Sequence, residues 1–143
     1  METQKIKTAV VVLNWNGKAW LEKFLANLVK HSQEATVFVA DNASTDDSVG
    51  FVKSNFPSVK IIINASNGGY AKGYNDALKQ IDAEYCVLIN SDIEVTEDWL
   101  SPIINLMDSD KKIAACQPKL LDYKKRNTFE YAGASGGFID NLG

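Results

Sequence analysis

The chain has 143 residues, of which 45% are hydrophobic and 23% charged, and its formal net charge is -3. These values are typical of one globular domain, and the slight negative charge excludes a general attraction to nucleic acid or to anionic membranes. The sequence contains no signal-peptide core and no run of about 18 apolar residues. We therefore expect a cytoplasmic protein, and leave open peripheral association with the inner face of the membrane through segments outside this chain.

Apolar runs alternate with amphipathic segments along the chain. The runs predict strands at residues 8–13, 36–40, 59–63, 85–89 and 113–116. Helices are predicted at residues 18–30, between a Ser44 or Thr45 cap and Pro57, at residues 70–81, and after a Thr96 cap. A short hairpin around the basic turn at residues 124–126 follows. This order predicts an α/β fold with a Rossmann-like, mostly parallel sheet and helices on both faces.

The fourth predicted strand carries the most informative polar ending. Its apolar run, residues 86–89, predicts a central strand covered on both faces, and Asn90-Ser91-Asp92 ends it. In open α/β sheets, ligands bind outside the carboxyl ends of strands. A carboxylate at this edge, beside a second strand that ends in Asp41-Asn42, can hold a divalent cation that neutralises a diphosphate. A turn-capping role for Asp92 is the alternative.

Polar loops follow the other strands at the same edge. Trp15 can stack on a base, Asp41 or Asn42 can hydrogen-bond a base edge, and Gly68-Gly69 lets the backbone approach a phosphate or sugar. Lys72 adds positive potential. Each residue also has a purely structural interpretation, as a core aromatic, a capping residue, a plain turn or a solvated helix residue. Their shared position at strand ends favours a nucleotide site.

Three other side chains with reactive or titratable groups have simpler interpretations. Cys86 and Cys116 lie in apolar runs without a paired-cysteine motif, so we expect buried, reduced thiols. His31 falls near the end of a predicted helix, where a helix-end cation is the expected role rather than a catalytic one.

Four motifs, in this order and spacing, resemble those of the family 2 glycosyltransferases, and most closely the bacterial rhamnosyltransferase-like members. They are Val10-Val11-Val12-Leu13-Asn14-Trp15-Asn16, Asp41-Asn42-Ala43-Ser44-Thr45-Asp46, Asn67-Gly68-Gly69-Tyr70-Ala71-Lys72-Gly73-Tyr74-Asn75 and Leu88-Ile89-Asn90-Ser91-Asp92. The resemblance covers nearly the whole chain. It implies a GT-A fold and inverting transfer of a sugar from a UDP- or dTDP-linked donor, usually with Mg²⁺ or Mn²⁺. The implied acceptor is a glycan or a lipid-linked acceptor in cell-surface polysaccharide synthesis.

The resemblance also implies roles for single residues. Trp15 matches the aromatic residue along the base, the backbone of Leu13 faces the nucleoside, and Asp41 with Asn42 matches an acidic pair that reads pyrimidine and ribose. The expected nucleotide-binding residues are Leu13, Trp15, Asp41, Asn42, Gly68, Gly69, Lys72, Asn90 and Ser91, with Asp92 as the metal ligand.

The sequence departs from the family pattern at three positions. Asn42 replaces the commoner second acid, and Asn90 replaces the first acid of the Asp-x-Asp metal motif, which leaves Asp92 as the expected ligand. Tyr74 stands where many relatives carry arginine, so a charge toward the donor is missing here.

We expect residues 1–143 to be the nucleotide-sugar-binding part of a longer glycosyltransferase domain. Glycines crowd the final residues, and no terminal helix or strand is evident there. In the family the catalytic base lies on a later segment, so the base is not identified. Glu94 and Glu130 are available carboxylates without motif support, and this chain alone can bind donor without transferring sugar.

Three alternative functions are compatible with an α/β fold of this kind. A dinucleotide-binding domain requires Gly-x-Gly-x-x-Gly after the first strand, which Asn14-Trp15-Asn16-Gly17 does not match. A receiver-like, phosphate-accepting module requires an acidic pair where Asn14 and Asn16 stand. A nucleotide-binding domain without transfer activity remains open, and the Asn90 replacement favours it.

Overall fold

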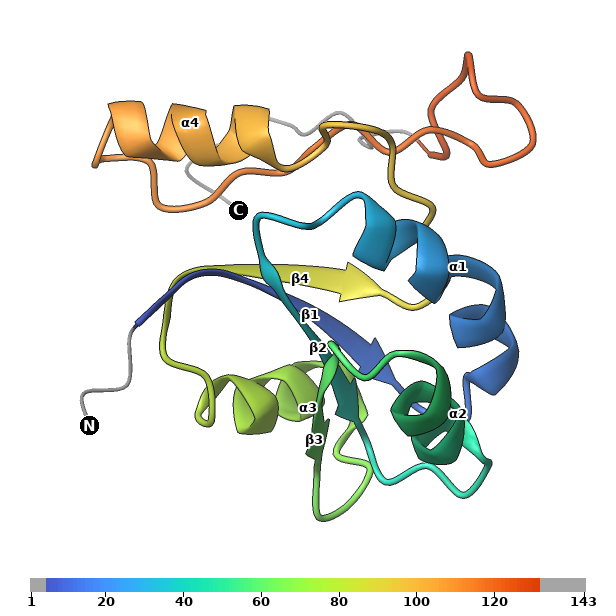
Figure 1. Ribbon diagram of the computed structural model, residues 1–143. Coiled ribbons are helices and arrows are strands. Elements are labelled where there is room, and N and C mark those ends of the chain that lie inside the picture. The colour runs from blue at the N-terminus through green and yellow to red at the C-terminus, as the bar shows by residue number, and fades with distance from the viewer. Residues whose placement is uncertain (1–4, 132–143) are drawn as a thin grey trace, which may run out of the picture. The chain divides into compact units, whose positions relative to one another are not determined.

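The computed structural model describes residues 5–131 (Figure 1). Contacts within the chain divide it into two compact units, Met1–Glu97 and Asp98–Gly143. The first unit contains all four strands of the sheet, and the helices of each unit are described below. The glycine-rich end, for which a continuation into further structure was predicted, lies outside the described residues.

Four parallel strands form the sheet in the order β3-β2-β1-β4. They are β1 (Ile6–Asn14), β2 (Thr36–Asp41), β3 (Lys60–Ile63) and β4 (Ala83–Asn90). β1 is central, and its β-branched run is buried from Thr8 to Val12. The register pairs Asn14 with Asp41, and Leu13 with Asn90. The polar strand ends therefore meet at one edge of the sheet.

Helices cover both faces of this sheet, as predicted. α3 (Gly69–Leu78) lies on one side, and α1 (Lys18–Lys30) and α2 (Ser48–Asn55) lie on the other (Figure 1). The core on the α3 side consists of Ala9, Val11, Phe38, Ala40, Ile62, Tyr74 and Ala77. α1 buries its apolar stripe of Leu21, Phe24, Leu25 and Leu28. Each such side chain contributes about 1.5 to 3 kcal/mol when fully buried, so burial on two faces fixes the sheet that carries the site.

The prediction of a central β4 covered on both faces is wrong for the described residues. β4 is an edge strand whose only described strand partner is β1. Its side chains alternate in exposure: Ile89 is buried, whereas Leu88 is 47% exposed. Cys86 is also exposed, against the prediction of a buried thiol. The neighbouring residues still shield its thiol in part from water, and this desolvation raises the pKa of the thiol. A continuous apolar run does not show whether both faces of the strand are covered. The prediction of a central strand failed for this reason.

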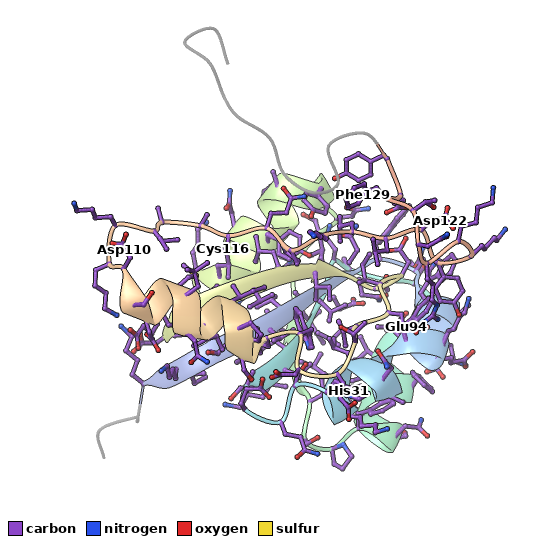
Figure 2. The ribbon with its side chains drawn as sticks, turned by 90° about the horizontal axis from the view of Figure 1, so that it is seen from above. His31, Glu94, Asp110, Cys116, Asp122 and Phe129 are labelled. Atoms are coloured by element: carbon purple, nitrogen blue, oxygen red, sulfur yellow. The ribbon has the colours of Figure 1, made fainter. Side chains whose placement is uncertain are left out.

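The predicted caps are also wrong. The residue before α2 is Asp47, and neither Ser44 nor Thr45 caps the helix. The Ser44 hydroxyl instead accepts from Nδ2 of Asn14 and from the backbone N–H of Asn16, and the Thr45 hydroxyl donates to Oδ1 of Asn16. α1 spans Lys18–Lys30, as predicted, and His31 follows it (Figure 2). The backbone N–H of His31 donates to the carbonyl of Asn27 at 3.1 Å.

The second unit begins with α4 (Ser101–Ser109). Pro102 lies in its first turn, where a missing N–H costs nothing. Thr96 does not cap this helix, because the residue before it is Leu100. In Figure 2, Asp110 lies at the end of α4, and the chain runs on through Cys116.

The predicted strand at residues 113–116 is not formed, and among residues 98–131 no strand pairs with this segment. Cys116 is exposed, against the prediction of a buried thiol. The predicted hairpin is confirmed: an antiparallel bridge joins Leu121 to Phe129, and Asp122 N–H donates to the Thr128 carbonyl at 3.0 Å. Within residues 5–131, no helix is both long and apolar enough to cross a lipid bilayer.

Candidate functional site

A hollow of about 260 Å³ lies at the carboxyl edge of the sheet. Its lining residues are Leu13, Trp20, Tyr70, Asn90, Ser91 and Asp92. Four of these were predicted as site residues, and they meet because β1 and β4 are neighbours with Leu13 opposite Asn90. Trp20 and Tyr70, both about half exposed or more, come from the first turns of α1 and α3.

Asp41 is held at the end of β2 by two hydrogen bonds. Its Oδ1 accepts from Nδ2 of Asn14 at 3.0 Å, and its Oδ2 accepts from the backbone N–H of Ser44 at 2.8 Å. The residue is only 1% exposed. A buried carboxylate requires donors of this kind, because an unpaired buried charge is strongly unfavourable. The carboxylate is therefore fixed before any ligand arrives.

Asn16 joins the loop after β1 to the loop after β2. Its Oδ1 accepts from the backbone N–H of Thr45 at 2.7 Å, and its own N–H donates to Oγ of Ser44 at 2.8 Å. Asn16 adopts φ 50°, a left-handed conformation that asparagine tolerates better than most residues. The locked loops present Trp15 with its side chain 58% exposed. An exposed ring on a fixed loop suits stacking against a base.

Asp46 extends this lock to the start of α1. Its carboxylate accepts from the backbone N–H of Lys18 at 3.1 Å and from that of Ser48 at 3.0 Å. Burial alone would raise the pKa of Asp46, but the hydrogen bonds from Ser48 and Lys18 and the charge of Lys18 outweigh it and lower this pKa. Asp46 is therefore charged at neutral pH. Its hydrogen bonds join the loop after β2 to the start of α1.

Asn42 is buried in a network of side-chain amides. Its Nδ2 donates to Oδ1 of Asn67 at 2.8 Å and to the carbonyl of Gly69 at 3.2 Å. Its Oδ1 accepts from Nδ2 of Asn64 at 3.1 Å. Both amide hydrogens are therefore used within the protein. The geometry makes Asn42 the link between β2 and the Gly68-Gly69 loop.

The Gly68-Gly69 loop leads directly into α3. Gly69 has φ 78°, a conformation that favours glycine, and a Cβ there would meet nothing within 4 Å. Its outer side is thus open. Lys72 lies one turn along the helix, where its ammonium group pairs with the carboxylate of Asp76. Lys72 does not line the hollow.

Gly17 lies where the loop after β1 passes the end of β4. A Cβ added to it would lie 2.5 Å from Oδ1 of Asn14 and 3.5 Å from Oγ of Ser91. Only glycine allows this approach without a shift. Oδ1 of Asn14 is buried and has no hydrogen-bond partner among residues 5–131.

The residues around Asp92 supply oxygen ligands of several kinds. Asp92 is exposed and shares the hollow with the amide of Asn90 and the hydroxyl of Ser91. Within the described part of the chain, no three His, Cys, Asp or Glu side chains cluster as a metal site. Mg²⁺ is usually held by one or two carboxylates together with substrate phosphates and water. The donor set fits a cation shared with a diphosphate, and not a cage built from protein alone.

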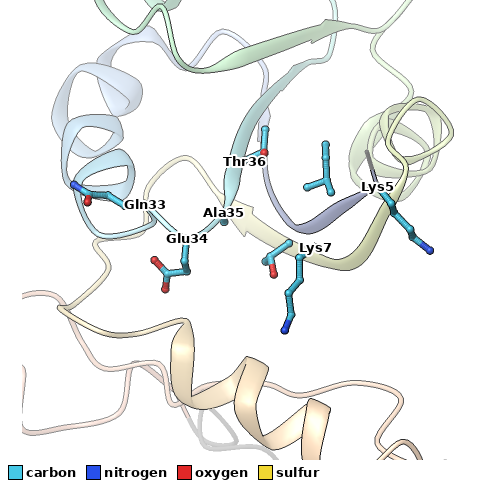
Figure 3. A pocket seen from close by; sticks show the side chains of 8 residues that line it. Lys5, Lys7, Gln33, Glu34, Ala35 and Thr36 are labelled. Atoms are coloured by element: carbon cyan, nitrogen blue, oxygen red, sulfur yellow. The ribbon is translucent and has the colours of Figure 1, made fainter. Parts of the chain in front are cut away.

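A second hollow, of about 300 Å³, lies at the opposite edge of the sheet (Figure 3). Residues at the start of β1 and of β2 line it, among them Lys5, Lys7, Glu34 and Thr36. None of the predicted site residues lines this hollow. The predicted site therefore corresponds to the carboxyl edge alone.

Sequence reasoning did not assign roles to Trp20 or to the locking side chains of Asn14 and Asn16. One signal for Trp20 was available: it lies outside the apolar stripe of α1, in the first turn after a predicted site loop. The bonds of Asn14 and Asn16 reach partners on another loop, 27 to 30 residues away. No local pattern indicates such partners.

Comparison with known proteins identifies the family. The family model described as "Glycosyl transferase family 2" matches residues 9–137. Poly(ribitol-phosphate) beta-N-acetylglucosaminyltransferase TarS of Staphylococcus aureus is 28% identical over 109 residues, which cover 72% of this chain and 19% of TarS. The uncharacterized glycosyltransferase YfnE of Bacillus subtilis is 27% identical over 131 residues, covering 88% of this chain and 32% of YfnE.

Solved structures agree with this assignment. The crystal structure of TarS residues 1–349 in complex with UDP-GlcNAc has a TM-score of 0.63 and covers 72% of this chain and 31% of that one. The mannosyltransferase PcManGT of Pyrobaculum calidifontis, solved with GDP-Man and Mn²⁺, is 24% identical and shares the fold at a TM-score of 0.55, over 63% of this chain and 28% of that one. The GT-A fold is thereby confirmed, and the dinucleotide-binding and receiver alternatives are excluded. The chain belongs to glycosyl transferase family 2.

Proposed function

We propose that the chain is the donor-binding part of an inverting glycosyltransferase. It binds a UDP- or dTDP-linked hexose or deoxyhexose for transfer to a glycan or lipid-linked acceptor in cell-surface polysaccharide synthesis. The observation that carries this proposal is the hollow in which Leu13, Asn90, Ser91 and Asp92 meet beside the locked loops of β1 and β2. The TarS structures with UDP-GlcNAc and with UDP support a uridine nucleotide.

The nucleoside end of the donor lies against the loops after β1 and β2. Trp15 is exposed enough to stack on the base, and the backbone of Leu13 faces the nucleoside. Asp41 reads the base edge through carboxylate lone pairs that Asn14 and Ser44 leave free. Asn42 contributes by holding the Gly68-Gly69 loop, whose open backbone lets the ribose or phosphate approach.

The diphosphate end lies beside Asp92. A Mg²⁺ or Mn²⁺ ion held by Asp92, with the amide oxygen of Asn90 in support, would neutralise the charge of the departing nucleoside diphosphate. Lys72 adds positive potential from α3, although its ammonium group is paired with Asp76. The exposed rings of Trp20 and Tyr70 flank this end of the hollow and present apolar surface to the sugar ring.

Inverting transfer also needs a base that deprotonates the acceptor hydroxyl on the face opposite the leaving group. Glu94 and Glu130 are the carboxylates considered from the sequence, and neither lines the hollow. We therefore assign no catalytic base to this chain. Donor binding without transfer is the second candidate function, and Asn90 favours it because an amide binds a cation more weakly than a carboxylate.

Isothermal titration with UDP and with dTDP, each with and without Mn²⁺, tests the proposal. We expect metal-dependent binding of one of the two in the parent chain and loss of the metal-dependent part in Asp92→Ala. Asp82→Ala is the matched control, because Asp82 is an exposed acid at the amino end of the same strand. Absence of binding of either nucleotide would contradict the proposal. If nucleotide binding depends on Mn²⁺ equally in Asp92→Ala and in the parent, Asp92 is not the metal ligand.

A further inference from the structure

Tyr74 lies inside the molecule, not at its rim. The residue is 2% exposed, and its hydroxyl donates a hydrogen bond of 2.9 Å to the backbone carbonyl of Ile89. Ile89 directly precedes Asn90 and lies three residues before Asp92 in the chain. A side chain of α3 thus bonds to β4 at the point where the strand gives way to the segment proposed to hold the metal ion.

The same hydroxyl also lies close to the end of β1. Burial, together with the neighbouring Tyr70, raises the pKa of Tyr74, while backbone groups of Leu13 and Ile89 act in the opposite direction. The hydroxyl is therefore protonated at any pH at which the protein works, and it can always donate. Leu13 and Ile89 precede the two halves of the proposed donor site.

The chain brings α3 unusually close to these strand ends. Gly73 precedes Tyr74, and a Cβ there would lie 3.0 Å from Cδ1 of Leu13 and 3.1 Å from Cγ of Asn42. A larger residue would push the helix away from β1. The glycine therefore allows the tyrosine hydroxyl to reach the backbone of the neighbouring strand.

We propose that Tyr74 is a positioning residue for the diphosphate end of the site. Its hydroxyl fixes the carboxyl end of β4 relative to that of β1, and so holds Asn90 and Asp92 where a cation and a diphosphate bind. This inference rests on the proposed function.

The hydroxyl, and not the ring, carries this role. The ring packs in the core with Ala9, Val11 and Ala77, and a phenylalanine would fill the same space. β4 has a described strand partner on one side only, so the Tyr74 bond holds its last residues from a second direction. Without that bond, the end of β4 keeps its pairing with β1, and the chain after it is next held at Val95, whose backbone N–H donates to Oδ1 of Asn27 at 3.0 Å.

Titration of Tyr74→Phe with UDP, in the presence and absence of Mn²⁺, tests the proposal. Loss of one buried hydrogen bond is worth about 1 kcal/mol, so we expect affinity with Mn²⁺ to fall by about fivefold. Affinity without Mn²⁺ should change by less than about twofold, because the loops that hold the base keep their own bonds. An equal loss with and without Mn²⁺, or no loss, would overturn the positioning role.

A control separates positioning from general destabilisation. Val52 is fully buried on α2 and does not line the hollow, and Val52→Ala lowers stability by leaving a cavity in the core. At a temperature where both variants are folded, Val52→Ala should keep the parent's Mn²⁺ dependence. If it loses that dependence as Tyr74→Phe does, the effect reflects stability and the proposal fails.

Hydrogen exchange gives a second readout that needs no nucleotide. In Tyr74→Phe, the amides of Asn90, Ser91 and Asp92 should exchange faster than in the parent, while the amides of β2 keep their rates. Unchanged exchange at these three amides would overturn the inference even if UDP binds. A parent chain that binds neither UDP nor dTDP would overturn the proposed function, and exchange would still decide whether Tyr74 holds this segment.

Discussion

Nδ2 of Asn14 donates a hydrogen bond of 3.0 Å to Oδ1 of Asp41, and this bond joins the last residues of two neighbouring strands. Both residues are about 1% exposed. The amide also donates to Oγ of Ser44 at 3.2 Å, so one side chain holds both the acid and the loop that follows it. The geometry of the proposed base-binding end therefore depends on a residue that contacts no base.

Replacement of Asn14 by alanine tests this dependence. The variant leaves the buried carboxylate of Asp41 with one donor fewer, which costs about 1 to 3 kcal/mol of unfolding free energy. Urea denaturation measures the loss, and UDP affinity should fall with it. Asn55→Ala is the control: its Nδ2 bonds to the carbonyl of Phe51 at an exposed position, and its loss should stay within about 0.5 kcal/mol. Equal losses in the two variants would contradict the role of Asn14.

Trp15→Ala should weaken UDP binding and leave folding unchanged. The side chain is 58% exposed, so the free energy of unfolding should shift by less than about 0.5 kcal/mol. Loss of a base–aromatic stack lowers affinity by about 1 to 3 kcal/mol, and Trp15→Phe should restore part of it. Calorimetry and urea denaturation measure the two quantities. A large loss of stability with unchanged affinity would show that the ring is structural.

Gly17→Ala should be destabilising through contact with one side chain. The added Cβ would lie 2.5 Å from Oδ1 of Asn14, which must then move away from Asp41 and Ser44. We expect a loss of about 1 to 3 kcal/mol, the cost of overpacking. In an Asn14→Ala background the amide oxygen that meets the added Cβ is absent. Gly17→Ala should then lower the free energy of unfolding by clearly less. Additive losses in the double variant would point to a different cause.

Acid should weaken the link between the two loops. The pKa of Asp46 is lowered in the folded chain, so its contribution to stability is fully present above the unfolded value of about 3.9 and is lost as pH falls through the folded pKa. Urea denaturation between about pH 2 and pH 6 should show the advantage of the parent over Asp46→Asn shrinking at the acid end. A constant difference across this range would show that the charge of Asp46 is not the source of the stability.

Much of the fold was predictable because it depends on local patterns. The β-branched run of β1 and the three-and-four spacing of Leu21, Phe24 and Leu28 each predict one element. Crossover connections make the strands parallel, so their carboxyl ends lie at the same edge of the sheet. This is why Leu13 and Asp92 could be placed together from sequence, and the hollow contains both.

The errors concern partners that sequence does not specify. Ser44 has the chemistry of a helix cap, but its hydroxyl accepts hydrogen bonds from Asn14 at the end of β1 and from Asn16 in the loop after it. Cys86 lies in an apolar run, but in β4 only every second side chain points to the covered face of the sheet. The roles predicted for Asn42 and Lys72 as nucleotide contacts stay predictions. In the structure, both side chains are already engaged with other residues of the chain.

The position of β1 has a consequence for assembly. β1 is flanked by β2 and by β4, and β4 is the last of the four described strands to be synthesised. Pairing of distant segments is slow because the loop between them must close before contacts form. During synthesis, Asn14 can pair with Asp41 as soon as β2 has been made. Leu13 can pair with Asn90 only after β4 has been made. We expect the two ends of the proposed donor site to form at different times, the nucleoside end before the diphosphate end.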